Sequence, residues 1–165
     1  MQNARNSIRI EPALKSQAPL VLYFIRQLAE YEKLLDKVEA DEARIEGSLF
    51  GEKPCAEAVI AYLGEEPAGL AIFFSTYSTF LGRPGIYLED LFVEPKLRGY
   101  GVGKALLVYL AKLTRERGGA RLEWSVLNWN EPAIQFYKGL GAAAQDAWTM
   151  YRVTGENLDK LAETL

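Results

Sequence analysis

The segment Arg98-Gly99-Tyr100-Gly101-Val102-Gly103-Lys104 lies between a predicted strand over 86–93 and a predicted helix that begins near Val102. Backbone N–H groups at a helix start have no partner within the helix, and glycines let a ligand approach that backbone closely. The helix dipole attracts an anion, and three cations surround the segment: Lys96, Arg98 and Lys104. The glycine-rich segment therefore predicts a phosphate-binding loop at the start of a helix.

The spacing of the glycines limits which phosphate compound this loop binds. A nucleoside-triphosphate loop needs Ser or Thr after Gly-Lys to hold Mg²⁺, but Ala105 follows Gly103-Lys104. A dinucleotide loop spaces its glycines G-x-G-x-x-G, whereas this one spaces them G-x-G-x-G. Both classes are disfavoured. A strand-to-helix turn that binds nothing stays open from spacing alone, although three cations are more than a bare turn needs.

Composition excludes several kinds of chemistry. The 165-residue chain contains no histidine and one cysteine, Cys55. Ser-His-Asp and Cys-His sites are thereby excluded, as is an intramolecular disulfide, and we expect no metal site. The net charge of −3 gives no overall attraction to nucleic acid or to anionic membranes, and we expect neither as a partner. The segment Met1-Gln2-Asn3-Ala4-Arg5 lacks an apolar signal stretch, so we expect a cytoplasmic protein.

Hydrophobic periodicity and turn signals predict an α/β chain that forms one domain over residues 1–165. Its fold class is a central mixed sheet flanked by helices. Asp41 is the expected N-cap of the second helix, and Asn130 or Glu131 that of the fourth. We expect strands over 7–11, 56–63, 68–77, 86–93, 121–127 and 147–153. We expect helices over 15–34 and 41–49, from Val102 to near Gly118, from Pro132 to Gly139 or Gly141, and from about Leu158 to Leu165.

Four sequence blocks in this order resemble the GNAT superfamily of N-acetyltransferases, specifically its spermidine/spermine (diamine) acetyltransferase branch. Arg98-Gly99-Tyr100-Gly101-Val102-Gly103 matches the R/Q-x-x-G-x-G/A motif of the superfamily. The block Tyr87-Leu88-Glu89-Asp90-Leu91-Phe92-Val93 comes directly before it. Asn128-Trp129-Asn130-Glu131-Pro132-Ala133-Ile134-Gln135-Phe136-Tyr137-Lys138 follows, and Leu28-Ala29-Glu30-Tyr31-Glu32 lies near the N-terminus. The resemblance covers nearly the whole chain and implies the GNAT acyl-CoA N-acyltransferase fold.

The resemblance implies a set of residues that bind acetyl-CoA. The backbone of the strand would hydrogen-bond the pantetheine arm, as an added strand does at a sheet edge. The glycine-rich loop would hold the pyrophosphate, and the start of the later helix would contact the far side of the coenzyme. These residues are Leu91, Phe92, Val93, Arg98, Gly99, Tyr100, Gly101, Val102, Gly103, Lys104, Asn130, Glu131, Pro132 and Ala133.

Direct acetyl transfer also requires a base and an acid, because an ammonium has no lone pair and the departing thiolate needs a proton. The resemblance assigns Glu89 to the amine, directly or through a water, and Tyr137 to the leaving sulfur. Partial burial and neighbouring Asp90 would make Glu89 a stronger base. Read without the motifs, Glu89 is a solvated strand end and Tyr137 a core aromatic beside Phe136.

Acidic and aromatic residues at family positions predict a small cationic amine as acceptor. They are Tyr31, Glu32, Glu89, Asp90, Asp146 and Trp148. Polyamine enzymes carry Asp and Trp at about Ser78 and Phe80, so this chain departs from their pattern. A diamine, a polyamine or a lysine-like amino acid such as thialysine all remain candidates. The resemblance also implies a homodimer. The competing hypothesis is a non-catalytic acyl-CoA-binding sensor or subunit.

Overall fold

The computed structural model describes residues 7–164 and divides the chain into two compact units, Met1–Ser125 and Val126–Leu165. The expectations for Met1–Arg5 and Leu165 lie outside the described residues. The N-terminal unit contains the sheet and three α-helices, so the central mixed sheet that the sequence predicts is confirmed.

Five strands form the sheet in sequence order, β1-β2-β3-β4-β5. The first three pairings are antiparallel and the last is parallel. A parallel pair needs a crossover, which α3 provides between β4 and β5. The strands are β1 (Ile8–Pro12), β2 (Glu57–Leu63), β3 (Glu66–Ser78), β4 (Arg83–Val93) and β5 (Leu122–Trp124). The sheet is therefore a continuous meander with one crossover at its last edge.

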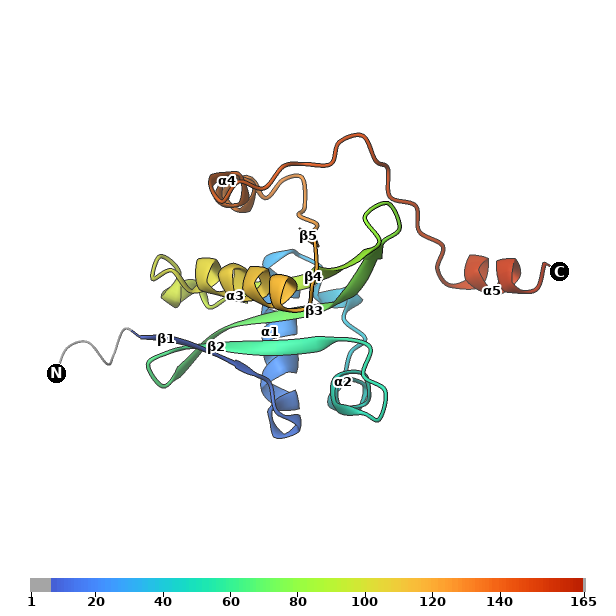
Figure 1. Ribbon diagram of the computed structural model, residues 1–165. Helices are drawn as coiled ribbons and strands as arrows, with labels where there is room; N and C mark the ends of the chain where they lie inside the picture. Colours follow the sequence, from blue (N-terminus) through green and yellow to red (C-terminus); the bar gives the residue numbers. More distant parts are fainter. Residues whose placement is uncertain (1–6, 165) are drawn as a thin grey trace. The chain divides into compact units, whose positions relative to one another are not determined.

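Helices cover both faces of this sheet, with α1 and α3 on opposite faces (Figure 1). Asp41 caps α2 as expected, since its carboxylate accepts a hydrogen bond from the backbone N–H of Arg44 at 2.8 Å. Gly118 follows α3 in the left-handed conformation, which agrees with the expected end of that helix. The helices are α1 (Ala18–Tyr31), α2 (Glu42–Phe50) and α3 (Val102–Glu116). Single-turn helices η2 (Lys15–Gln17) and η4 (Pro95–Leu97) precede α1 and α3, and η3 (Leu35–Lys37) lies between α1 and α2.

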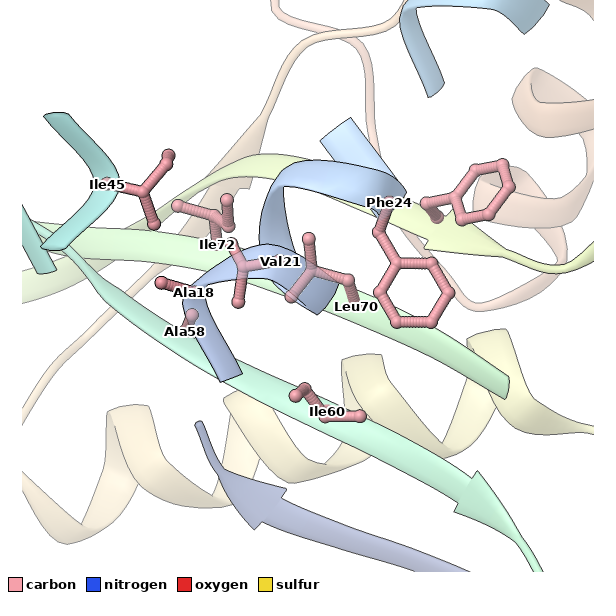
Figure 2. Packing of buried hydrophobic residues seen from close by; sticks show 9 residues of the cluster. Ala18, Val21, Phe24, Ile45, Ala58, Ile60, Leu70 and Ile72 are labelled. Carbon is pink, nitrogen blue, oxygen red and sulfur yellow. The ribbon is translucent and has the colours of Figure 1, made fainter. Parts of the chain in front are cut away.

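The core on the α1 face joins the helix to β2, β3 and β4. Side chains from these elements point toward one another, and Ile45 of α2 closes the cluster (Figure 2). Phe24 of α1 is 1% exposed, and its ring centroid lies 5.8 Å from that of Phe92 on β4. Ile72 of β3 belongs to the same cluster, which fixes the face of its cross-strand neighbours. This core thus anchors the end of α1 beside the end of β4.

The C-terminal unit contains α4 (Glu131–Gly139) and α5 (Glu156–Ala162). The prediction of a strand over 147–153 is wrong, because these residues are exposed and form no ladder. Strands need a hydrogen-bonded neighbour, and the described part of this unit contains only helices and irregular backbone. The predicted strand over 121–127 is also too long, since β5 ends at Trp124. The single domain over 1–165 stays a prediction.

Candidate active site

A β-bulge in β4 positions the two acidic residues of the candidate site. Ile72 pairs with Asp90, while the next residue of β3, Phe73, pairs with Leu88, so Glu89 is an extra residue in its strand. Because Ile72 belongs to the α1-face core, its partner Asp90 shares that face. The bulge breaks the alternation that would place Glu89 and Asp90 on opposite faces. Both Glu89 and Asp90 are therefore candidates for the acidic group of the site.

Three carboxylates gather where α1 ends against β4. Burial raises the pKa of Asp90 to about 6, and the charges of Glu89 and Glu32 add to that rise. Burial also raises the pKa of Glu32, which is the C-cap residue of α1. Asp90, the neighbour of the predicted base Glu89, is thus a carboxyl whose pKa is raised toward neutrality. A site with this charge favours a cationic ligand.

The glycine-rich loop leads from β4 into α3 with two residues in the left-handed region. Gly99 has a φ of 85° and Gly101 a φ of 88°, a conformation that costs other L-residues about 1–2 kcal/mol. Space does not require these glycines, because a Cβ at Gly99 would meet nothing within 4 Å. Conformation alone therefore accounts for both glycines, as in a plain strand-to-helix turn. Other features of the loop, described next, favour a ligand.

The start of α3 is suited to an anion. Gly101 is the N-cap residue and has no side chain to cap the first N–H groups, whereas Asp41 caps α2. Lys104 is exposed in the first turn of α3, and Tyr100 is 56% exposed in the loop. Val102 is buried and anchors the helix start to the core. The uncapped, positively charged helix start is the arrangement that phosphate groups bind.

The edge of β4 beside this loop is open within the N-terminal unit. There β5 pairs with β4 only at residues 86–88, so residues 89–93 face no strand of the described part of the unit on that side. Their other side pairs with β3, from Gly69 opposite Val93 to Ile72 opposite Asp90. Phe92 is buried in the core and Leu91 is partly buried. An extended ligand could thus add to the edge of β4 through backbone hydrogen bonds.

Arg98, which by resemblance is predicted to bind the coenzyme, contacts Tyr31, which is predicted to bind the acceptor. Its guanidinium lies over the ring of Tyr31, 4.9 Å from the ring centroid, and its Nε donates to the carbonyl of Val93 at 3.1 Å. The contact between Arg98 and Tyr31 was not predicted from the sequence, and neither was the hydrogen bond from the Tyr23 hydroxyl to Glu94. Neither pair has a sequence signal, because the partners lie far apart in the chain.

The C-terminal unit holds the remaining predicted residues. Asn130 caps α4, as one of the two expected caps, by accepting a hydrogen bond from the N–H of Ala133. Its neighbour Glu131 accepts a hydrogen bond from the Gln135 side chain, and Pro132 lies in the first turn. Tyr137 lies on α4, and its ring centroid is 5.4 Å from that of Phe136. Asp146 and Trp148 are exposed in the segment after α4.

The two positions that depart from the polyamine pattern lie at the β3–β4 hairpin. Ser78 is buried, and its hydroxyl accepts a hydrogen bond from the N–H of Leu81, so it stabilises the turn. Phe80 is 95% exposed. The described residues, 7–164, contain no group of His, Cys, Asp and Glu that could hold a metal ion. None of the helices described is long and apolar enough to cross a membrane.

Comparisons with known proteins identify a family and several relatives. Residues 22–142 match the model of the acetyltransferase (GNAT) family. The chain is similar to a thialysine N-epsilon-acetyltransferase of Bos taurus, with 34% identity over 94% of this chain and 97% of that protein. It is also similar to a human spermidine/spermine acetyltransferase-like protein, with 26% identity over 98% of this chain but only 24% of that protein.

Solved structures show the same likeness. An integron cassette protein from Vibrio cholerae superimposes with a TM-score of 0.79 and 29% identity, over 95% of this chain and 98% of that one. The family match spans the bulge, the glycine-rich loop and α4, so it includes both predicted catalytic residues. The chain therefore belongs to the GNAT family, in its spermidine/spermine acetyltransferase-like branch, and is an N-acetyltransferase.

Proposed function

We propose that this N-acetyltransferase transfers the acetyl group of acetyl-CoA directly to a primary amine of a small cationic acceptor. One observation carries the proposal: β4 presents its acidic bulge and its open edge directly before the uncapped start of α3. The donor and acceptor sites then share a single strand. GNAT acetyltransferases use acetyl-CoA as their co-substrate.

The coenzyme would bind along the open edge and the loop. The backbone of residues 91–93 supports pantetheine binding, since this edge faces no strand among the described residues of its unit. The helix start at Val102 and the nearby Lys104 support pyrophosphate binding. Asn130 to Ala133 would contact the far side of the coenzyme, as the family resemblance implies. No covalent acetyl-enzyme is needed, in keeping with a chain that contains no histidine.

The acceptor would bind at the three carboxylates. Glu32, Glu89 and Asp90 attract an ammonium group, and Tyr31 at the end of α1 offers an aromatic face. Glu89, on the bulge, would accept the amine proton directly or through a water, and the raised pKa of Asp90 makes it a second candidate base. Tyr137 would donate a proton to the leaving sulfur.

A lysine-like amino acid or a short diamine fits this acceptor site better than a long polyamine. Ser78 stabilises the hairpin turn and supplies no carboxylate, so the extra charge expected for a long polycation is missing there. The similarity to a thialysine acetyltransferase covers nearly the whole length of both proteins, which supports a lysine-like acceptor. A single domain over residues 1–165, a homodimer and a cytoplasmic location complete the proposal.

A thiol-release assay tests the proposed function. The purified protein is mixed with acetyl-CoA and a panel that includes thialysine, lysine, diamines, spermidine and aminoglycosides. We expect thiol release with basic amino acids or short diamines, and a much lower rate for Glu89→Gln. Binding of acetyl-CoA without thiol release for any amine would contradict the proposal and favour a sensor role.

A further inference from the structure

Arg98 and Tyr31 form a direct contact between the coenzyme loop and the acceptor helix. The guanidinium carbon lies 4.9 Å from the centroid of the Tyr31 ring. Tyr31 is the last residue of α1, and Arg98 lies between η4 and α3. A cation in this position is attracted by the ring quadrupole, with about 0.5–1 kcal/mol at an exposed site.

A second contact fixes the orientation of the guanidinium. Its Nε donates to the Val93 carbonyl at 3.1 Å, at the end of β4. The guanidinium is planar, and all its N–H donors point outward within that plane. The guanidinium carbon lies over the Tyr31 ring, and Nε is committed to the Val93 carbonyl. The Nη donors can bind an anion while both of these contacts stay intact.

The rest of the connecting segment is also fastened. The Tyr23 hydroxyl of α1 donates to the Glu94 carboxylate at 2.8 Å. Lys96 forms an ion pair with Glu66 at the start of β3, and the N–H of Glu94 donates to the carbonyl of Ala68 at 2.9 Å. Residues 94–98 are therefore held against α1 and the sheet, which fixes the backbone position from which the Arg98 side chain reaches Tyr31.

The same contact reaches the acidic group of the acceptor site. Tyr31 is followed directly by Glu32, the C-cap of α1, and the charge of Glu32 acts on Asp90. A change in the position of Tyr31 would therefore move a carboxylate of the acceptor site. Conversely, the Tyr31 ring limits the positions that the Arg98 guanidinium can take.

We propose that Arg98, stacked on Tyr31, is a positioning residue that couples coenzyme binding to acceptor binding. The inference rests on the proposed function, because it needs the coenzyme at the loop and the amine at the carboxylates. Tyr31 orients the guanidinium for the coenzyme phosphate, and a phosphate-bound Arg98 holds Tyr31 and Glu32 for the amine. By linkage the coupling is reciprocal. The energy of an exposed cation–π contact corresponds to a two- to five-fold change, at about 1.4 kcal/mol for each factor of ten.

A double-mutant cycle on the affinity for free CoA, measured by isothermal titration calorimetry, tests the coupling. Tyr31→Leu removes the ring and should weaken CoA binding about two- to five-fold. Tyr31→Phe keeps a ring and should bind CoA like the wild type. In an Arg98→Gln background, Tyr31→Leu should cause no further loss. Equal CoA affinity for Tyr31→Leu and wild type, or two losses that multiply, would overturn the inference.

Arg98→Lys provides a test that does not depend on altering α1. It keeps a positive charge for the phosphate but loses the planar stack on Tyr31. We expect it to raise the KM for the amine about two- to five-fold, which a residue that only binds phosphate would not do. An unchanged KM for the amine would overturn the inference. A wild-type protein that does not bind CoA would overturn the proposed function as well, so the two failures are distinguishable.

Discussion

Replacing Asp90 with Asn should stabilise the protein at neutral pH. The pKa of Asp90 rises from 3.8 to about 6 in the folded state, because burial and the charges of Glu89 and Glu32 penalise its ionised form. The native state therefore binds a proton more tightly than the unfolded state, and stability falls as pH rises from about 4 to 6. At 1.36 kcal/mol per pKa unit, and allowing for partial solvent screening, the ionised carboxylate costs about 2–3 kcal/mol at pH 7.

Urea unfolding of wild type and Asp90→Asn across pH 4 to 8 measures this difference. The variant should be more stable by about 2–3 kcal/mol at pH 7. The difference should shrink several-fold by pH 4, where the carboxyl is protonated in the native state and begins to be protonated in the unfolded state. Glu65→Gln is the matched control, since it also removes one negative charge but from a side chain that is 98% exposed. It should show little change at any pH.

Two results would refute this reasoning. One is a stability difference that stays constant between pH 4 and 8, which would show that Asp90 is not protonated on folding. The other is an Asp90→Asn variant less stable than wild type at pH 7, which would show that the carboxylate is favourably paired. If the reasoning holds, the carboxylate persists at a cost to stability, as functional groups often do.

Three further changes test other parts of the structure. Tyr137→Phe should lower kcat and leave the affinity for acetyl-CoA unchanged; equal kcat values would remove Tyr137 as the acid. Gly101→Ala should lower the free energy of unfolding in urea by about 1–2 kcal/mol, because Gly101 has a left-handed φ of 88°. Gly47→Ala, within α2, should raise it by about 0.5–1 kcal/mol. Two changes of the same sign would contradict the left-handed conformation of Gly101. Phe24→Ala should cost about 3–5 kcal/mol because the ring is 1% exposed, and a loss below 1 kcal/mol would be incompatible with this core.

Local signals in the sequence predict much of this fold because they act over a few residues. Asp41 caps α2 at the expected place, and Gly118 follows α3 in the left-handed region. The glycines likewise predict the loop between β4 and α3, where Gly99 and Gly101 have positive φ. Such features depend on the chemistry of one or two side chains and on their own backbone, so they can be recognised without tertiary contacts.

The errors and omissions come from contacts between distant residues. The bulge at Glu89 appears only when β4 is aligned with β3, and the burial that raises the pKa of Asp90 comes from tertiary packing. The stack of Arg98 on Tyr31 joins residues that sequence analysis assigned to different ligands. The alternating segment 147–153 has β-forming residues but no neighbouring strand in its described unit, and propensity alone does not form a strand.

Mass spectrometry of a single reaction mixture tests the central claim most directly. The protein is incubated with acetyl-CoA and the best amine from the panel, and the amine, the free CoA and the intact protein are all quantified. We predict one acetylated amine for each CoA released, with the protein, including Cys55, left unmodified. Release of CoA without acetylated amine, or accumulation of acetyl-protein as an intermediate, would contradict direct transfer.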